Sequence, residues 1–131
     1  MNIHTNAAFG TFILRIALGL VLLAHSVYLK LFVFTLPGTA QFFGSLGLPE
    51  FLAYVVFAAE AIGGIALIIG FKTNLVALAL IPVLLGATWA HLGSGWLFTN
   101  PGGGWEYPLL LVVIAGVQAL LGNGSFALTK D

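Results

Sequence analysis

Long apolar runs separated by short breaks account for most of the chain. They cover about residues 9–34, 51–70, 75–96 and 106–122. About 17–25 apolar residues are enough for an α-helix to cross a bilayer. The runs lack the in–out alternation of membrane strands, and four strands are too few to close a barrel. The pattern predicts an all-α, polytopic membrane protein, with four transmembrane helices in one antiparallel bundle over residues 1–131.

Composition supports a membrane location. Hydrophobic residues make up 60% of the chain and charged residues 6%, and the mean hydropathy is +1.12. Ordinary soluble domains are about 25% charged, so the lipid bilayer is the expected surrounding. The formal net charge is zero, which offers no basic surface to nucleic acid. The chain has no cysteine, so a redox role would use a bound cofactor or a partner protein rather than thiols.

The few lysines set an expected orientation. Lys72 lies in the break after the second run and Lys130 in the C-terminal tail, whereas residues 35–50 and 97–105 contain no Lys or Arg. Cytoplasmic loops are enriched in Lys and Arg. Both termini are therefore expected to face the cytoplasm across the inner cell membrane. The N-terminus lacks the basic region of a secretory signal, which predicts a retained first helix.

Charged residues inside the predicted spans are the first candidates for function, because each costs about 2.5–3.5 kcal/mol in hydrocarbon even on the mildest scale. Arg15 lies about a third of the way across and Glu60 near the middle. We expect the two to form a pair, which is either structural or serves to bind an anion or relay protons. Lys30 and Glu106 lie at the outer boundary, where Lys30 is expected to pair with Glu106 or Glu50.

His25 and His91 reach similar depths in the outer half, and with Lys30 and Glu106 they form the predicted ligand-binding set. The alternative is that the histidines make interhelical hydrogen bonds. Two histidines alone are a weak metal signal, and no motif supports a bis-histidine haem. At 100° per residue, an α-helix places His25 and Lys30 on different faces. The sequence assigns no catalytic residue.

Small residues and loops predict how the helices pack and how they are connected. Gly63 and Gly64 lie next to Glu60 and would let a neighbouring helix approach closely. Residues 39–46 are amphipathic and predict a short interfacial helix, which would either cap a cavity or lie on the membrane. The glycines at 102–104 precede Glu106 and form either a backbone site for a ligand or a plain turn.

An ordered set of motifs runs along most of the chain. It comprises Leu14-Arg15-Ile16-Ala17-Leu18-Gly19, Ala24-His25 and Lys30, Phe43 through Leu48-Pro49, Glu60-Ala61-Ile62-Gly63-Gly64 with Gly70, His91 with Gly93-Ser94-Gly95-Trp96, Gly104-Trp105-Glu106, and Gly122-Asn123-Gly124-Ser125 with Leu128. Together they resemble the DoxX family of small four-helix membrane proteins. A common family form of the first motif is His-Gly-x-x-Lys. Here Ser26 replaces the glycine, Lys30 stands one residue later, and the last three residues depart from the family ending.

The resemblance implies a fold and a location more than a reaction. Members of the family include a subunit of a thiosulfate:quinone oxidoreductase, and many are labelled oxidoreductases. We therefore expect a redox-linked subunit that binds a quinone or a similar small molecule among its helices, with a redox partner protein and a homo-oligomer as further expectations. The alternatives are a non-enzymatic membrane scaffold and a small-molecule-binding or transport protein.

Overall fold

The computed structural model describes residues 3–130, and all of its regular elements are helices. Met1, Asn2 and Asp131, which the predicted domain includes, lie outside the described residues. The elements are α1 (Ile3–Leu23), the π-helix η1 (Ala24–Val33), α2 (Leu36–Ser45), α3 (Leu52–Ile69), α4 (Thr73–Ala90), the 3₁₀ turn η2 (Leu92–Ser94) and α5 (Glu106–Leu121). The predicted all-α, polytopic class is confirmed.

Three helical stretches are long and apolar enough to cross a membrane: Thr5–Val33, Leu52–Ile69 and Thr73–Ser94. The fourth apolar helix, α5, has 16 residues. The second predicted run ends as expected, since Gly70 takes a left-handed conformation with φ 75° and stops α3. The first helix begins earlier than predicted, at Ile3, and α4 ends at Ala90 instead of reaching residue 96.

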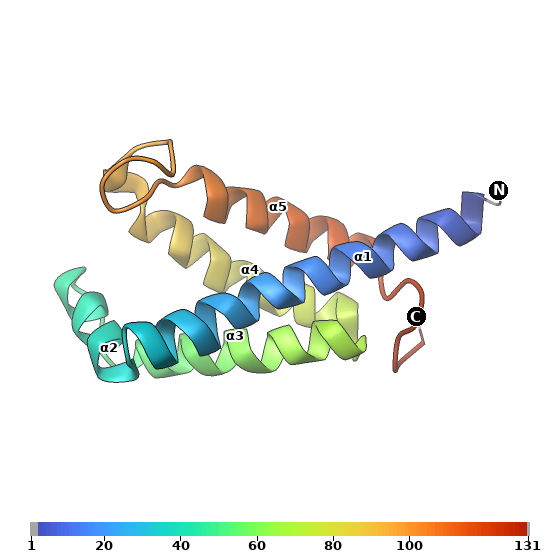
Figure 1. Ribbon diagram of the computed structural model, residues 1–131, viewed down its shortest axis with the longest axis horizontal. Helices are drawn as coiled ribbons and strands as arrows, with labels where there is room; N and C mark the ends of the chain where they lie inside the picture. The colour runs from blue at the N-terminus through green and yellow to red at the C-terminus, as the bar shows by residue number, and fades with distance from the viewer. Residues whose placement is uncertain (1–2, 131) are drawn as a thin grey trace.

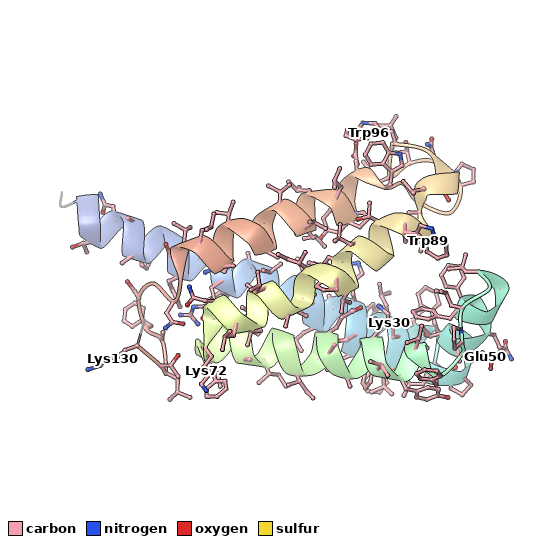
Figure 2. All side chains as sticks on the ribbon, turned by 180° about the vertical axis from the view of Figure 1, so that it is seen from behind. Lys30, Glu50, Lys72, Trp89, Trp96 and Lys130 are labelled. Atoms are coloured by element: carbon pink, nitrogen blue, oxygen red, sulfur yellow. The ribbon has the colours of Figure 1, made fainter. Side chains whose placement is uncertain are left out.

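The four long helices form an antiparallel bundle (Figure 1). The pair α4–α5 packs most extensively, α1–α3 next, and α3–α4 joins the two pairs, while α1 and α5 meet less closely. Lys72 and Lys130 lie at one end of the bundle, here called the basic end (Figure 2). Glu50, Trp89 and Trp96 lie at the other, here called the aromatic end.

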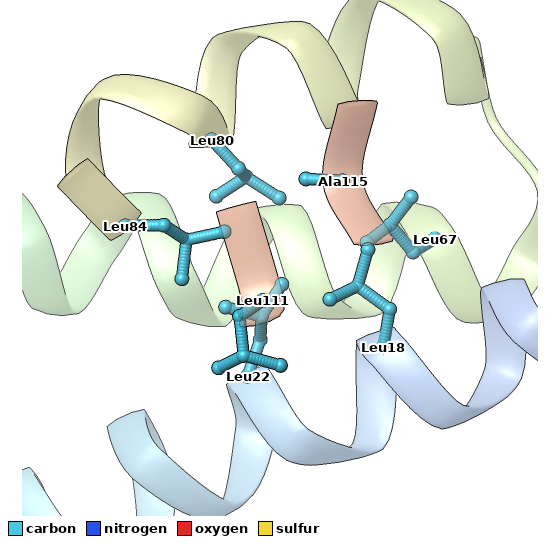
Figure 3. Close-up of a cluster of buried hydrophobic side chains, with 7 residues drawn as sticks. All are labelled: Leu18, Leu22, Leu67, Leu80, Leu84, Leu111 and Ala115. Atoms are coloured by element: carbon cyan, nitrogen blue, oxygen red, sulfur yellow. The ribbon is translucent and has the colours of Figure 1, made fainter. Parts of the chain in front are cut away.

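A small apolar core holds the four helices together. It consists of Leu18, Leu22, Leu67, Leu80, Leu84, Leu111 and Ala115 (Figure 3). Many other large apolar side chains point outward, among them Ile62 at 69% and Leu120 at 89% exposure. Such a surface would be unstable in water but matches lipid, where apolar side chains cost nothing to expose. The outward apolar faces agree with a bilayer as the surrounding.

Glycines set how closely α1 approaches α3. A Cβ added to Gly19 would lie 2.9 Å from the carbonyl oxygen of Gly64, and one added to Gly64 would lie 3.0 Å from that of Gly19. The backbones therefore touch at this crossing, as small residues allow in membrane helices. Gly63 faces the other way, against the side chain of Leu80 on α4. The predicted role of the glycines beside Glu60 is confirmed.

The short helix expected in the first long loop is present as α2. Its first turn is capped by Thr35, whose hydroxyl accepts a hydrogen bond from the Gly38 amide at 3.1 Å. Thr39 and Ala40 are buried, whereas Phe42 is half exposed. The helix packs on α3 and η1, so it covers the aromatic end of that side of the bundle.

Candidate functional site

The second half of the first span is a π-helix, and this changes which residues share a face. The Phe34 amide donates to the Leu29 carbonyl at 2.7 Å, five residues earlier. Since hydrogen bonds in a π-helix join residues five apart, positions i and i+5 lie one turn apart on nearly the same face. His25 and Lys30 have this spacing. The expectation that they face different directions assumed a regular α-helix and is wrong.

Lys30 forms a salt bridge with Glu60 across the α1–α3 side of the bundle. Its Nζ lies 3.0 Å from one carboxylate oxygen and 3.1 Å from the other. The side chains are 18% and 8% exposed, so both charges are largely removed from solvent and lipid. The sequence predicted Arg15 as the partner of Glu60, and Glu106 or Glu50 as the partner of Lys30. Both pairings are wrong, because η1 turns the long Lys30 side chain inward and down to Glu60.

Arg15 is instead held by backbone carbonyls at the basic end. It is fully buried, and its guanidinium donates to Leu67 and Ile68 at the end of α3 and to Asn123, Ser125 and Phe126 in the C-terminal tail, at 2.7 to 3.2 Å. The last carbonyls of a helix carry partial negative charge, so they offset the buried cation without a carboxylate. Every N–H group of the guanidinium has a carbonyl partner. Arg15 is therefore a structural clamp that holds α1 to α3 and the tail, rather than a site for an anion.

Gly70 makes this clamp possible. A Cβ at this position would lie 2.8 Å from Nη1 of Arg15 and 2.7 Å from Ala127 of the tail. The tail is fastened a second time, because the Leu128 and Thr129 amides donate to the carbonyls of Ile69 and Gly70. Nothing in the sequence of the tail marks its backbone carbonyls as partners of Arg15, so this contact was not predicted.

Each histidine is hydrogen-bonded within its own helix. Nδ1 of His25 lies 2.9 Å from the Val21 carbonyl, and Nδ1 of His91 lies 2.8 Å from the Ala87 carbonyl. A carbonyl can only accept, so Nδ1 carries the proton in both rings, and in the neutral form Nε2 is left with a free lone pair. Interhelical hydrogen bonds between the histidines and other helices, which the sequence allowed, are not what these rings make.

His25 lies between α3 and α5. Its ring stacks on that of Tyr107, with centroids 6.1 Å apart and planes inclined by 28°, and it lies within electrostatic range of the Glu60 carboxylate. The ring contact with Tyr107 thus joins η1 to the start of α5. His91, by contrast, packs under Gly103 of the loop before α5. Of the predicted ligand-binding residues, the structure brings His25 and Lys30 together and places His91 and Glu106 at the loop.

Two hollows adjoin Tyr107. The first, here called the α1/α5 groove, has a volume of about 190 Å³ and is lined by Leu14, Ala17, Leu18, Val21, Tyr107, Leu111 and Ile114. The second, here called the aromatic pocket, has a volume of about 500 Å³ and is lined by Trp96, Phe98, Glu106, Tyr107 and Leu110. The groove is apolar and follows the loosely packed boundary between α1 and α5. Tyr107 was not among the predicted site residues, since an aromatic near a helix end reads as a membrane anchor.

Metal binding finds no support among residues 3–130, where no group of three or more His, Asp or Glu side chains is placed to hold an ion. The candidate site consists of an apolar groove, an aromatic pocket, an imidazole and a buried Lys–Glu pair.

Comparison with known proteins identifies the family. A family model described as DoxX matches residues 10–93, which run from α1 into η2. The chain belongs to the DoxX family. The DoxX match ends before α5, so Glu106 and Tyr107 lie outside it.

A DoxX relative from Bacillus subtilis (strain 168), named "Putative oxidoreductase CatD", is 42% identical over 78 residues, which is 60% of this chain and 56% of that protein. The chain thus matches little more than half of the relative's length. No solved structure matches this DoxX chain.

Proposed function

We propose that this protein is a redox-linked membrane subunit that binds a quinone, or a small molecule of similar chemistry, in the α1/α5 groove. The observation that carries the proposal is the position of Tyr107, which lines the groove and stacks on His25. A quinone site needs an apolar slot and one or two polar groups that orient the carbonyl oxygens. The groove supplies the slot, and Tyr107 with His25 supplies the polar end. The oxidoreductase name of the relative from Bacillus subtilis supports the same class of function.

The small volume of the groove suits a ligand that remains partly in lipid. The lining is almost entirely apolar and lies along the boundary of two membrane helices. A quinone ring would enter sideways from the bilayer while its isoprenoid tail stays among the acyl chains. Access from water is not required.

Proton transfer is the chemistry that the chain itself can supply. Reduction of a quinone to a quinol takes up two electrons and two protons. The free lone pair on Nε2 of His25 is suited to exchanging one proton, and the Glu60 carboxylate, bridged to Lys30, can exchange another along the same polar layer. The electrons would come from a partner protein or from the reduced substrate, because the chain has no thiol.

The orientation proposed with this function places the basic end, with both termini, in the cytoplasm of a cell whose inner membrane holds the protein. The positive-inside rule supports it, because Lys72 and Lys130 both lie at that end. The His25–Tyr107 contact then lies toward the outer half of the bilayer.

The test is photolabelling with an azido-quinone, followed by mapping of the labelled peptide. We expect label on α1 near Val21 or on α5 near Tyr107, competed by unmodified quinone. Ala17→Phe fills the groove and should lower labelling at least about fivefold, whereas Ile62→Phe, on the exposed face of α3, should leave it unchanged. Label spread evenly over the apolar faces, with no effect of Ala17→Phe, would contradict the proposal.

His91 provides a second control: neither histidine lines the groove, but His25 stacks on Tyr107, which does, whereas His91 packs against Gly103. His25→Ala should weaken competition by quinone, and His91→Ala should not. Equal effects of the two substitutions would place the ligand elsewhere and favour the alternative of a scaffold or transport protein.

A further inference from the structure

Glu106 carries a carboxylate that no side chain in the described part of the chain pairs with. The Lys30 ammonium, its expected partner, is bound to Glu60. Glu106 is half-buried in the first turn of α5. An ionised carboxylate at the membrane boundary without a protein cation is open to a cation from outside.

Aromatic residues share a pocket with Glu106. Trp96, Phe98 and Tyr107 line the aromatic pocket with Glu106, and Leu110 completes the lining. Trp96 also meets Trp105 edge to face, with ring centroids 4.4 Å apart and planes inclined by 76°. Rings present a negative face, so a set of them beside a carboxylate attracts organic cations, above all quaternary ammonium groups.

The loop that forms the pocket is held in place by its own backbone. The Trp105 amide donates to the Gly95 carbonyl at 3.0 Å, and the Glu106 amide donates to that of Trp96 at 3.2 Å. These bonds join the two ends of the loop. Gly104 packs against the carbonyls of Trp96 and Leu97 with no space for a Cβ. The backbone that carries Trp96 and Glu106 is therefore ordered before any ligand arrives, which lowers the entropic cost of binding.

We propose that the aromatic pocket binds an alkylated ammonium group, with Glu106 as the counter-ion and the rings of Trp96, Phe98 and Tyr107 as the cation–π surface. The site is separate from the α1/α5 groove, since the two share only Tyr107. Such a group is found both in small free cations such as choline and in the headgroups of zwitterionic lipids such as phosphatidylcholine. The proposal does not depend on quinone binding.

The first experiment is saturation-transfer NMR of choline with the full chain in a non-ionic maltoside detergent, at a pH of about 8 where free histidines are neutral. The comparison ligand is 3,3-dimethylbutanol, the uncharged isostere of choline. We expect choline to bind at least about fivefold more tightly than the isostere. Equal binding of the two ligands to the unmodified protein would overturn the proposal without any variant.

Substitutions then locate the site. Glu106→Gln keeps the shape and removes the charge, and should weaken choline binding about fivefold to tenfold. Glu50→Gln removes another carboxylate at the same end and should have no effect. Trp96→Leu should weaken binding to a similar degree, with circular dichroism confirming the helices. Binding unchanged by both Glu106→Gln and Trp96→Leu would refute the assignment.

A second experiment, with lipids, distinguishes a lipid headgroup from a free ammonium compound as the source of the bound group. Native mass spectrometry would compare retention of phosphatidylcholine and phosphatidylglycerol with matched acyl chains. Retention of phosphatidylcholine that Glu106→Gln abolishes, and that millimolar choline does not displace, supports a lipid headgroup. Displacement of phosphatidylcholine by choline supports a small free ammonium compound as the ligand. If neither lipid retention nor choline binding responds to Glu106→Gln, the pocket is not an ammonium site.

Discussion

Gly19 of α1 and Gly64 of α3 lie back to back, and each occupies the space that a Cβ on the other would need. The crossing sits between the two charged contacts of the α1–α3 pair. On one side Arg15 reaches Leu67 and Ile68, and on the other Lys30 reaches Glu60. The glycine contact therefore sets the helix separation on which both contacts depend.

The first prediction concerns this crossing. Gly64→Val should lower the free energy of unfolding by about 2–3 kcal/mol, because the methyl groups would force the helices apart. The control is Gly86→Val on α4, where an added Cβ meets nothing within 4 Å. Thermal unfolding in detergent measures both, and equal stability of the two variants would show that the close approach is not required.

The second prediction concerns the Arg15 clamp. Arg15→Lys should destabilise the protein by about 3 kcal/mol or more, since an ammonium cannot reach carbonyls on both α3 and the tail, and several would be left unpaired in a buried place. Lys130→Gln, in the exposed tail, should change little. Full stability of Arg15→Lys, measured by the same unfolding assay, would mean that charge alone is needed there.

The third prediction concerns the Lys30–Glu60 salt bridge. Lys30→Met alone leaves a buried carboxylate without its cation and should cost about 3 kcal/mol or more. The double variant Lys30→Met with Glu60→Leu removes both charges and should recover most of that loss. A double-mutant cycle measures the coupling. Additive losses would show that the 3.0 Å contact contributes no coupling energy.

The fourth prediction concerns orientation. The chain has no cysteine, so a single introduced cysteine is a unique label site. Thr99→Cys at the aromatic end should react with an impermeant maleimide on intact cells, and Lys130→Cys only after the membrane is opened. The opposite pattern would reverse the proposed orientation and place the basic end outside.

More of the fold than of the candidate site could be predicted from the sequence. Hydrophobic runs predicted the helices, because burial in lipid acts on every residue of a span. The pairing of charges was not predictable in the same way, since it depends on the local helix type. Depth along the spans paired Lys30 with Glu106 or Glu50, but the π-helix over Ala24–Val33 and the length of the Lys30 side chain bring its ammonium to Glu60 instead.

The carbonyl partners of Arg15 and the contact of Tyr107 with His25 could not be predicted from the sequence for a different reason. Carbonyl groups are present in every residue, so no pattern marks Leu67 or Asn123 as partners of Arg15. Tyr107 acquires a role only through contact with His25, 82 positions away by their numbers (107 − 25). What could be found from sequence was Glu106, His25 and Lys30 as polar positions in an apolar chain.

The attachment of Arg15 to the tail has a consequence for biosynthesis. The guanidinium lies on α1, but three of its acceptors, Asn123, Ser125 and Phe126, follow α5 and are therefore synthesised only after the four long helices. Until they leave the ribosome, the nascent first helix holds a cation whose hydrogen bonds are incomplete. The helix bundle thus completes its assembly only after residues 123–126 have been made, and a truncated chain that stops at Leu121 would expose a polar defect for membrane quality control to recognise.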